Sequence, residues 1–543
     1  MFPLFFHHLC RRTARYFSQN RTAKITTASL FVLLILSLSA AIFLFFLHGF
    51  RFLSFSGYFE EALLLYLSEL FMFTLFVLIF VSALITGLFS LFSGKEKVLL
   101  ALSPKFPLIP LLILTRMFFV SLWPILILIL PALLALSLTY QLSFWGALFI
   151  ILALALFVAL AVITALSLIF LVAKILFSLR KTFLTHRVLV LITLLFSALF
   201  ISIAWQNIRS VSLNTLFSVE AIENTTADIT LIQSHFSLLP SHPAALVFFA
   251  VSQNNLHLLL QSVGIILAFL CLAFIPFLLL KKNHLSLWQH FQEIDNAHSS
   301  APRSFAATLS HASGPLNALF RKEIITFFRN TRGMTWFGFF CLIWLFQNGS
   351  TFILNHQLSE RPQVFPYIVI TLQIAAAIYF VNMFVLRFAF PSFSMEQKMS
   401  WVIESAPLDK AKIFLARIGF YVPLLILLGF LFSLLNTLVI PLSSFQYFLV
   451  LSVVCLASAT TTLYGLALGA LFPNFETDDP EFLSTSLPGL TFIFTSVLYG
   501  GFAATAVRSY LISKDFTFLI LFFLFSLLVA FFSVTIPLRY LRK

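Results

Sequence analysis

Charged residues are scarce in this chain. Asp, Glu, Lys and Arg make up 10% of its 543 residues, whereas hydrophobic residues make up 61% and Phe alone occurs 71 times. A soluble domain of this length needs more polar surface than this composition supplies. The composition therefore excludes an ordinary soluble protein and favours one that is embedded in a membrane.

Cysteine is also rare, and the residues that hold metals are scattered. The chain has four cysteines and no C-x-x-C pair, so neither a disulfide framework nor a zinc site is indicated. The histidines are dispersed as well, and the adjacent pair His7 and His8 is too small a cluster to indicate a metal site. We expect no metal and no bound cofactor.

Several motifs of nucleotide and hydrolytic chemistry are missing. No G-x-x-x-x-G-K-[ST] string occurs, and the nearest one, from Gly87 to Lys95, has the wrong spacing and is followed by Glu96. Neither G-x-S-x-G nor H-E-x-x-H is present. The sequence therefore predicts a protein that is not an enzyme, that has no nucleotide-binding domain of its own, and that takes energy from outside if it is a pump.

Long apolar runs are what the chain does contain. Runs of about 18 or more residues recur along its length, which predicts an all-α polytopic membrane protein with about twelve transmembrane helices. A β-barrel is excluded, because its strands would be about 10 residues long and would alternate apolar with polar residues. We expect Pro124 and Pro131 to break the third span, and a short apolar helix at Pro243–Val251 to lie on the outer face. The predicted spans cover Ile25–Leu47, Leu63–Phe92, a third ending at Tyr140, Leu142–Leu176, a fifth ending at Trp205, Leu256–Leu280, Met334–Leu354, Phe365–Pro391, Ile413–Ile440, Phe445–Phe472, Ser486–Ala506 and Phe516–Pro537.

The net charge of +14 indicates an unequal distribution of Lys and Arg between the two sides of a bilayer rather than affinity for nucleic acid. Lys and Arg gather in the loops that follow even-numbered spans, with an acidic loop at Glu476–Glu481 as the exception. The polar stretch 207–255 is poor in both residues, which places it outside. This bias predicts that both chain ends are cytoplasmic.

The order of spans and basic segments occurs twice, which predicts two parallel six-helix repeats. The first membrane half covers 1–280 and begins with a basic N-terminal elbow, and the second covers 321–543. A polar linker at 281–320 joins them in the cytosol. The second half opens with its own basic elbow, at Arg321, Lys322 and Glu323.

Two similar charged segments stand at equivalent places in the repeat. Each begins with an acidic residue, reaches a small-residue–Pro step and then enters a span; we call them the coupling segments, Glu96–Pro104 and Glu396–Pro407. A short helix at the cytosolic rim, apolar on one side and charged on the other, can dock in a groove of a partner protein. The competing interpretation is that both are ordinary loops. The residues predicted to carry the docking are Glu96, Lys97, Pro104, Glu396, Lys398, Trp401, Glu404 and Pro407.

Few ionisable residues lie inside the predicted spans, and each one calls for an explanation. Arg116, Arg387 and Arg417 lie near span ends, so we expect their side chains to reach the headgroups. Glu69 lies deeper. It is either a polar wall residue of a transport pathway or a residue that faces a short outer cavity.

Three sets of residues carry a family resemblance. They are the two coupling segments, the stretch Tyr464–Phe475 with Asp479–Pro480 and Ser484–Ser486, and the elbow Arg321–Glu323 with Phe327–Asn330. With these the chain resembles the large permease subunits of bacterial ABC-2-type exporters. The resemblance implies a separate cytosolic ABC ATPase as partner, ATP-driven export of an unknown substrate, and a place in the bacterial inner membrane. It also implies that the coupling segments receive force from that ATPase.

Two other classes of function compete with this interpretation. An ion-coupled secondary transporter with twelve spans would carry an Asp-Arg-x-Gly-Arg loop between spans two and three, and the chain has Gly94-Lys95-Glu96-Lys97 there. It would also carry more carboxylates at mid-membrane. A membrane-embedded enzyme or scaffold has no acid, base, nucleophile or metal cluster in the sequence to support it.

Overall fold

The structure is a computed structural model, and it describes the chain in blocks. These are residues 60–91, 109–179, 239–253, 255–281, 286–289, 315–357, 365–399, 409–438, 443–475 and 486–542, with single positions around them. Within these blocks every regular element is a helix and no strand occurs. The predicted all-α class is therefore confirmed for the described part of the chain.

The chain divides into two compact units. Unit 1 combines Met1–Leu38 with Arg303–Lys543, and unit 2 is Ser39–Pro302. The predicted division into 1–280, a linker at 281–320 and 321–543 stays a prediction. Each unit is described by itself below.

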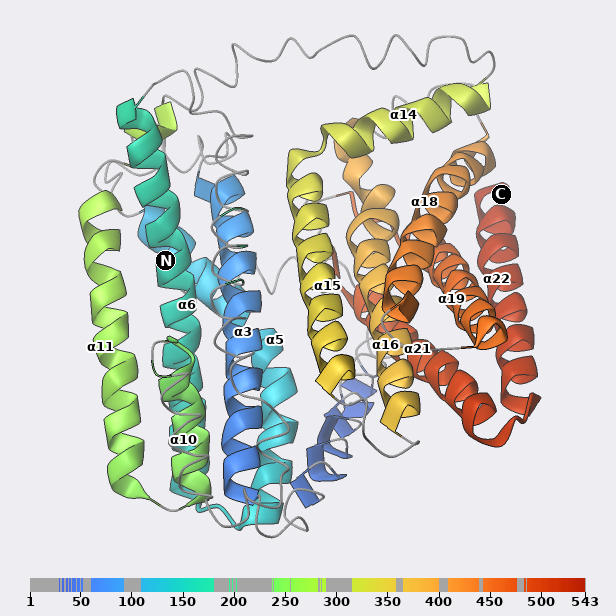
Figure 1. Cartoon of the computed structure of the whole chain (residues 1–543). Helices are drawn as coiled ribbons and strands as arrows, with labels where there is room; N and C mark the ends of the chain where they lie inside the picture. Colours follow the sequence, from blue (N-terminus) through green and yellow to red (C-terminus); the bar gives the residue numbers. More distant parts are fainter. Residues whose placement is uncertain are drawn as a thin grey trace. The chain divides into compact units, whose positions relative to one another are not determined.

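Unit 2 is built around one long apolar helix, α6. This helix packs against each of its four neighbours in the unit, and its core-facing residues include Phe157, Leu166 and Phe170. Figure 1 shows α10 alongside α3 and α6. In the described part of unit 2, the five α-helices with defined bounds that pack against one another are α3 (Glu60–Leu91), α5 (Ile109–Tyr140), α6 (Phe144–Leu179), α10 (His242–Ser252) and α11 (Leu256–Leu280).

Helix α10 lies within the core of unit 2. Most of its residues are buried, and they belong to the same apolar core as α3, α6 and α11. The predicted short helix exists, and its expected position on the outer face of the membrane stays a prediction. Small side chains such as Ala245 and Ala250 let it fit closely between longer helices.

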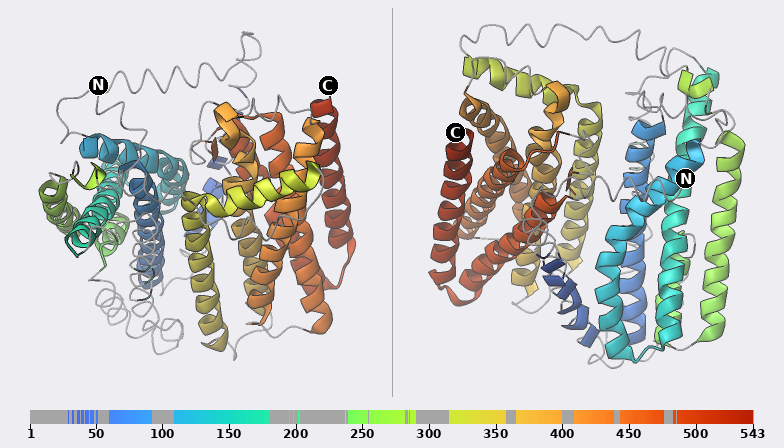
Figure 2. Two further views of the ribbon diagram at one scale, coloured as in Figure 1. Left: turned by 90° about the horizontal axis from the view of Figure 1, so that it is seen from above. Right: turned by 180° about the vertical axis from the view of Figure 1, so that it is seen from behind.

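Unit 1 is built around α19, which packs against α16, α18, α21 and α22. Helix α14 lies crosswise to the long helices of this unit and packs against α18 and α15, as Figure 1 and the left view of Figure 2 show. In the described part of this unit, the seven α-helices with defined bounds are α14 (Pro315–Arg329), α15 (Thr331–Gln357), α16 (Phe365–Phe384), α18 (Lys410–Leu438), α19 (Ser444–Leu471), α21 (Leu487–Ser513) and α22 (Thr517–Arg542).

Eight described helices are long and apolar enough to cross a membrane. They run over Ser68–Leu91, Phe144–Ile175, Leu256–Leu279, Ile370–Ser392, Lys410–Leu435, Ser444–Leu471, Leu487–Ser513 and Thr517–Leu541. Two of them, Leu256–Leu279 and Thr517–Leu541, bury only 22% of their most apolar window, so they present a broad apolar face to the surroundings. Membrane association follows from this, whereas twelve spans in two six-helix repeats stay a prediction.

The prolines do not interrupt the third predicted span. Helix α5 runs without a break through Pro124 and Pro131, so the expectation of a broken span is wrong. Pro276, Pro423 and Pro537 likewise lie inside α11, α18 and α22. Membrane helices tolerate proline because neighbouring helices and local adjustments satisfy the freed carbonyl groups.

The inner geometry of α16 changes at its C-terminal end. The helix passes into a π-helical turn at Val385–Ala389, then into 3₁₀ turns at Phe390–Ser392 and Ser394–Met399. Two glycines of α19 face this irregular stretch in a G-x-x-x-G pattern. A Cβ on Gly469 would collide with the carbonyl oxygen of Phe390, and one on Gly465 would collide with Val385. The glycines therefore allow the irregular stretch to lie directly on α19.

Candidate functional site

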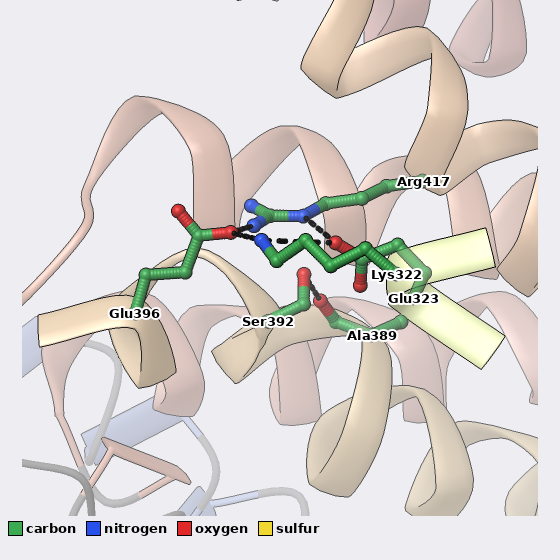
Figure 3. A network of polar contacts seen from close by, with 6 residues as sticks. All are labelled: Lys322, Glu323, Ala389, Ser392, Glu396 and Arg417. Atoms are coloured by element: carbon green, nitrogen blue, oxygen red, sulfur yellow. Dashed lines mark hydrogen bonds and ion pairs between the residues drawn. The ribbon is translucent and has the colours of Figure 1, made fainter. Parts of the chain in front are cut away.

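Four charged side chains from three elements of unit 1 form one network, shown in Figure 3. Lys322 Nζ lies 2.5 Å from Glu396 Oε1 and 3.7 Å from Glu323 Oε1. Arg417 Nε donates to Glu323 Oε1 at 3.3 Å, and Arg417 Nη2 donates to Glu396 Oε1. We call these four residues the ion network. It joins α14, the 3₁₀ turn at Ser394–Met399 and α18.

Local structure explains how the three elements meet. On α14, Leu319, Glu323 and Phe327 recur at every fourth position and are buried, so one face of the helix points into unit 1. The 3₁₀ turns after α16 redirect the chain, and the backbone N–H of Asn474 donates to Ser394 Oγ at 2.9 Å. This bond holds the turn that carries Glu396.

The side chains of the network differ in how far they are buried. The Arg417 side chain is 0% exposed, and its guanidinium lies 3.7 Å from the centroid of the Phe393 ring. Glu323 is buried as well, whereas the Lys322 side chain is 37% exposed. Two carboxylates and two cations balance in charge, and a buried charge persists only when it is paired and hydrogen-bonded. The network therefore fastens three elements together and is suited to mechanical work.

The ion network does not form a candidate metal centre. Among the described residues there is no group of three or more His, Cys, Asp or Glu side chains arranged to hold a metal ion. The Arg and Lys of the network donate hydrogen bonds and carry positive charge.

The structure brings together some of the predicted site residues and leaves others outside its description. Lys322 and Glu323 of the predicted elbow meet Glu396 of the second coupling segment, and Arg321 lies beside them on α14. Lys398 lies in the same 3₁₀ turn as Glu396. The predicted residues that lie outside the described part of the chain are Glu96, Lys97, Pro104, Trp401, Glu404 and Pro407. The roles assigned to all of these residues stay predictions.

Arg417 is the network member that sequence reasoning misplaced. We expected its side chain to reach the headgroups, but it is enclosed by protein and paired with Glu323 and Glu396. Its partners lie 94 and 21 positions away along the chain, so no local sequence pattern predicts the pairing. Arg387, which received the same prediction, lies with its guanidinium carbon 4.3 Å from the centroid of the Trp336 ring.

Unit 2 has a smaller polar contact of its own. Glu69 on α3 is 0% exposed, and its Oε1 lies 2.5 Å from Nδ1 of His242, the first residue of α10. Sequence reasoning selected Glu69 but not its partner. Whether Glu69 lines a pathway or faces a cavity stays a prediction.

Comparison with known families gives one match that covers nearly the whole chain. Residues 19–543 match the family model described as "Putative ATP-binding cassette". Neither the curated proteins nor the solved structures contain a match to this chain.

The family match overturns four predictions. It replaces the resemblance to ABC-2-type permeases, which depended on short motifs such as Arg321–Glu323. It also contradicts an export permease without a nucleotide-binding domain, a chain that is not an enzyme, and a separate cytosolic ATPase as partner. An ion-coupled secondary transporter is not supported either. Because the sequence holds no G-x-x-x-x-G-K-[ST] string, we assign no residue to the nucleotide.

Proposed function

Because this chain belongs to the putative ATP-binding cassette family, we propose that it works in an ATP-binding cassette transporter as a membrane-embedded protein. We propose further that the ion network of unit 1 is its mechanical joint. Nucleotide-dependent movement then passes between α14, the 3₁₀ turn at Ser394–Met399 and α18.

The single observation that carries this proposal is the buried Arg417, whose charge is balanced by glutamates of two other elements. Removing one partner of a buried ion pair costs about 3 to 5 kcal/mol, because an uncompensated charge is left behind. Arg417 is shared by both glutamates, so separating any one element from the others exposes such a charge. The three elements therefore move together.

The arrangement of α14 supports a place at a membrane surface. Its buried face includes Leu319 and Phe327, while Leu316, Phe320 and Phe328 remain exposed beside basic residues. A helix with exposed apolar and basic side chains binds at the boundary between headgroups and acyl chains. We propose that this end of unit 1 faces the cytoplasm, in the cell membrane of a bacterium, because Arg321 and Lys322 of α14 and Lys410 and Lys412 at the start of α18 are basic.

We also propose that the coupling segments take part in the same movement. Glu396 is the first residue of the second segment and already belongs to the ion network. Any displacement of Glu396–Pro407 is therefore passed to α14 and α18. By the repeat, Glu96–Pro104 would act in unit 2 in the same way.

The proposal is tested by the response of α14 to nucleotide in native membrane vesicles. The four cysteines are replaced, and one cysteine is placed at Leu316, a half-exposed position of α14 that lies outside the network. We expect the rate of maleimide labelling to differ at least about threefold between ATP and ADP, as an element that changes its environment should. The difference should vanish in the variant Arg417→Met.

A matched control uses Arg116→Met, since Arg116 is an exposed arginine on α5 that no described contact places in the network. This variant should keep the nucleotide response of the label. An identical labelling rate with ATP and ADP in the otherwise unchanged protein would contradict the proposal. A response that persists in Arg417→Met would leave the family assignment standing and remove the ion network from the mechanism.

A further inference from the structure

The contact between Glu69 and His242 differs from the ion network because it pairs a single carboxylate with an imidazole. Glu69 lies nine positions into α3, which places it about 13 Å from the start of that helix at 1.5 Å per residue. Its carboxylate meets the imidazole at the first position of α10, an 11-residue helix inserted among α3, α6 and α11. Burying a carboxylate in such a place costs folding free energy unless the group is paired or protonated.

Two oxygen atoms near this contact lack a hydrogen-bond partner within the described residues. One is Glu69 Oε2, the second oxygen of the paired carboxylate. The other is the Oγ of Ser241, which directly precedes His242 and is 0% exposed. Ser241 stands at the N-cap of α10, yet its side chain makes no capping hydrogen bond. The site therefore holds more acceptor capacity than the protein itself satisfies.

Most of the remaining titratable groups around this site are more open to their surroundings. Among the described ones on elements that pack with α3 or α10, Tyr140 and Lys281 are half-buried, and His284 is buried against Leu91 at the opposite end of α3. The others are exposed; they are His48, Arg51, Arg116, Lys174, His257 and Cys271. Burial thus distinguishes Glu69 from the exposed and half-buried groups, and His284 contacts α3 at Leu91, 22 positions beyond Glu69.

We propose that Glu69 and His242 form a proton-binding site that holds α10 in place only while one exchangeable proton is bound. With the proton present, the pair is either an imidazolium and a carboxylate or an imidazole and a carboxylic acid, and both states are neutral overall. Loss of the proton leaves one net negative charge enclosed between α3 and α10. When α10 is displaced, both side chains are exposed to solvent, and water solvates the negative charge.

The direction of the pH effect follows from proton counting. The packed state of α10 retains a proton that the displaced state releases to neutral and alkaline solution, because a solvated imidazole and a solvated carboxylate hold none there. The equilibrium constant for displacement then rises about tenfold for each unit of pH over that range. Acidification acts in the opposite sense and keeps α10 packed.

Hydrogen exchange of the full chain in lipid nanodiscs tests this proposal. Peptides covering residues 243–253 are followed from about pH 6 to about pH 10, a range that brackets imidazole titration, and rates are corrected for the intrinsic effect of pH. We expect the corrected exchange in these peptides to rise towards tenfold per unit of pH. The variant Glu69→Gln has the same shape and no charge, so it should lose this dependence.

His257→Gln is the matched control, since His257 is an exposed histidine on the neighbouring helix α11. This variant should keep the pH dependence of the unaltered protein. Exchange that does not depend on pH in the unaltered protein overturns the proposal by itself, whether or not a variant folds. Retention of the dependence in Glu69→Gln overturns it as well, because the titrating group then lies elsewhere.

Discussion

The two units bury charge in different ways. In unit 1, two carboxylates are matched by an arginine and a lysine, and the network joins three elements. In unit 2, one carboxylate is matched by a histidine, which is a cation only when it is protonated. The choice of partner therefore separates a permanent joint in unit 1 from a conditional one in unit 2.

The largest expected effect breaks the permanent joint. Arg417→Met removes the cation that Glu323 and Glu396 share and leaves the buried Glu323 and the partly buried Glu396 facing one half-exposed lysine. We expect a loss of about 3 to 5 kcal/mol in the free energy of unfolding, measured by thermal or denaturant unfolding in nanodiscs.

The comparison variant for this change is Arg116→Met, at an exposed position of α5 in unit 2. It should change stability by about 0.5 kcal/mol or less. Equal losses in the two variants would show that the network does not stabilise unit 1. The triple variant Arg417→Met, Glu323→Gln and Glu396→Gln should recover much of the loss, since no buried charge is left unpaired and the remaining cation, Lys322, is half-exposed to solvent.

The next effect concerns close contact between helices. In Gly469→Ala the added Cβ meets the carbonyl oxygen of Phe390, a backbone atom that cannot rotate away. We expect a loss of about 1 to 3 kcal/mol in unfolding free energy, the range typical of overpacking. Gly501 on α21 has open space around its missing Cβ, so Gly501→Ala should be neutral or slightly stabilising.

A third effect separates two histidines within unit 2. His284 Nε2 lies 3.0 Å from the carbonyl oxygen of Leu91, and burial lowers the pKa of this imidazole. Because the folded state binds fewer protons than the unfolded state, the stabilisation is complete above the ordinary histidine pKa of about 6.5 and is lost as the pH falls below it.

This prediction is checked by hydrogen exchange in peptides at the C-terminal end of α3. Exchange near Leu91 should accelerate severalfold between about pH 7 and about pH 5, and His284→Gln should abolish this dependence. The contact between Glu69 and His242 is expected to respond to pH in the opposite direction, because hydrogen exchange in residues 243–253 should accelerate as the pH rises. A common direction at both places would refute the comparison.

The smallest effect is a close contact that can relax. In Gly87→Ala of unit 2 the new Cβ would lie 2.8 Å from Ile169 Cδ1 and 2.9 Å from Leu166 Cδ2, both at the ends of flexible side chains. We expect a loss of about 1 kcal/mol or less. A cost equal to that of Gly469→Ala would show that the nature of the opposing atom does not matter.

Apolar periodicity and length were sufficient to locate most of the described helices. The span predicted at Leu256–Leu280 has the same bounds as α11, and the one predicted at Phe445–Phe472 differs from α19 by one residue at each end. Such agreement is expected, because the length of an apolar run and its flanking caps are local properties. The proline rule failed for α5, because packing of a membrane helix compensates for a missing hydrogen bond.

The candidate site was only partly predictable. Lys322, Glu323 and Glu396 stood out as charges between apolar runs, and the structure joins them. The identity of Arg417 as their partner, and of His242 as the partner of Glu69, depends on contacts 94, 21 and 173 positions apart. Short motifs also led to the wrong family, since a few matched residues weigh less than a match over 19–543.

By itself the sequence determined that this protein is helical, apolar and suited to a membrane, because those properties follow from composition and from the length of each apolar run. Only the tertiary structure decided which buried charges meet. It placed Arg417 between two glutamates and His242 against Glu69, since charge pairing acts through space between helices that are distant along the chain.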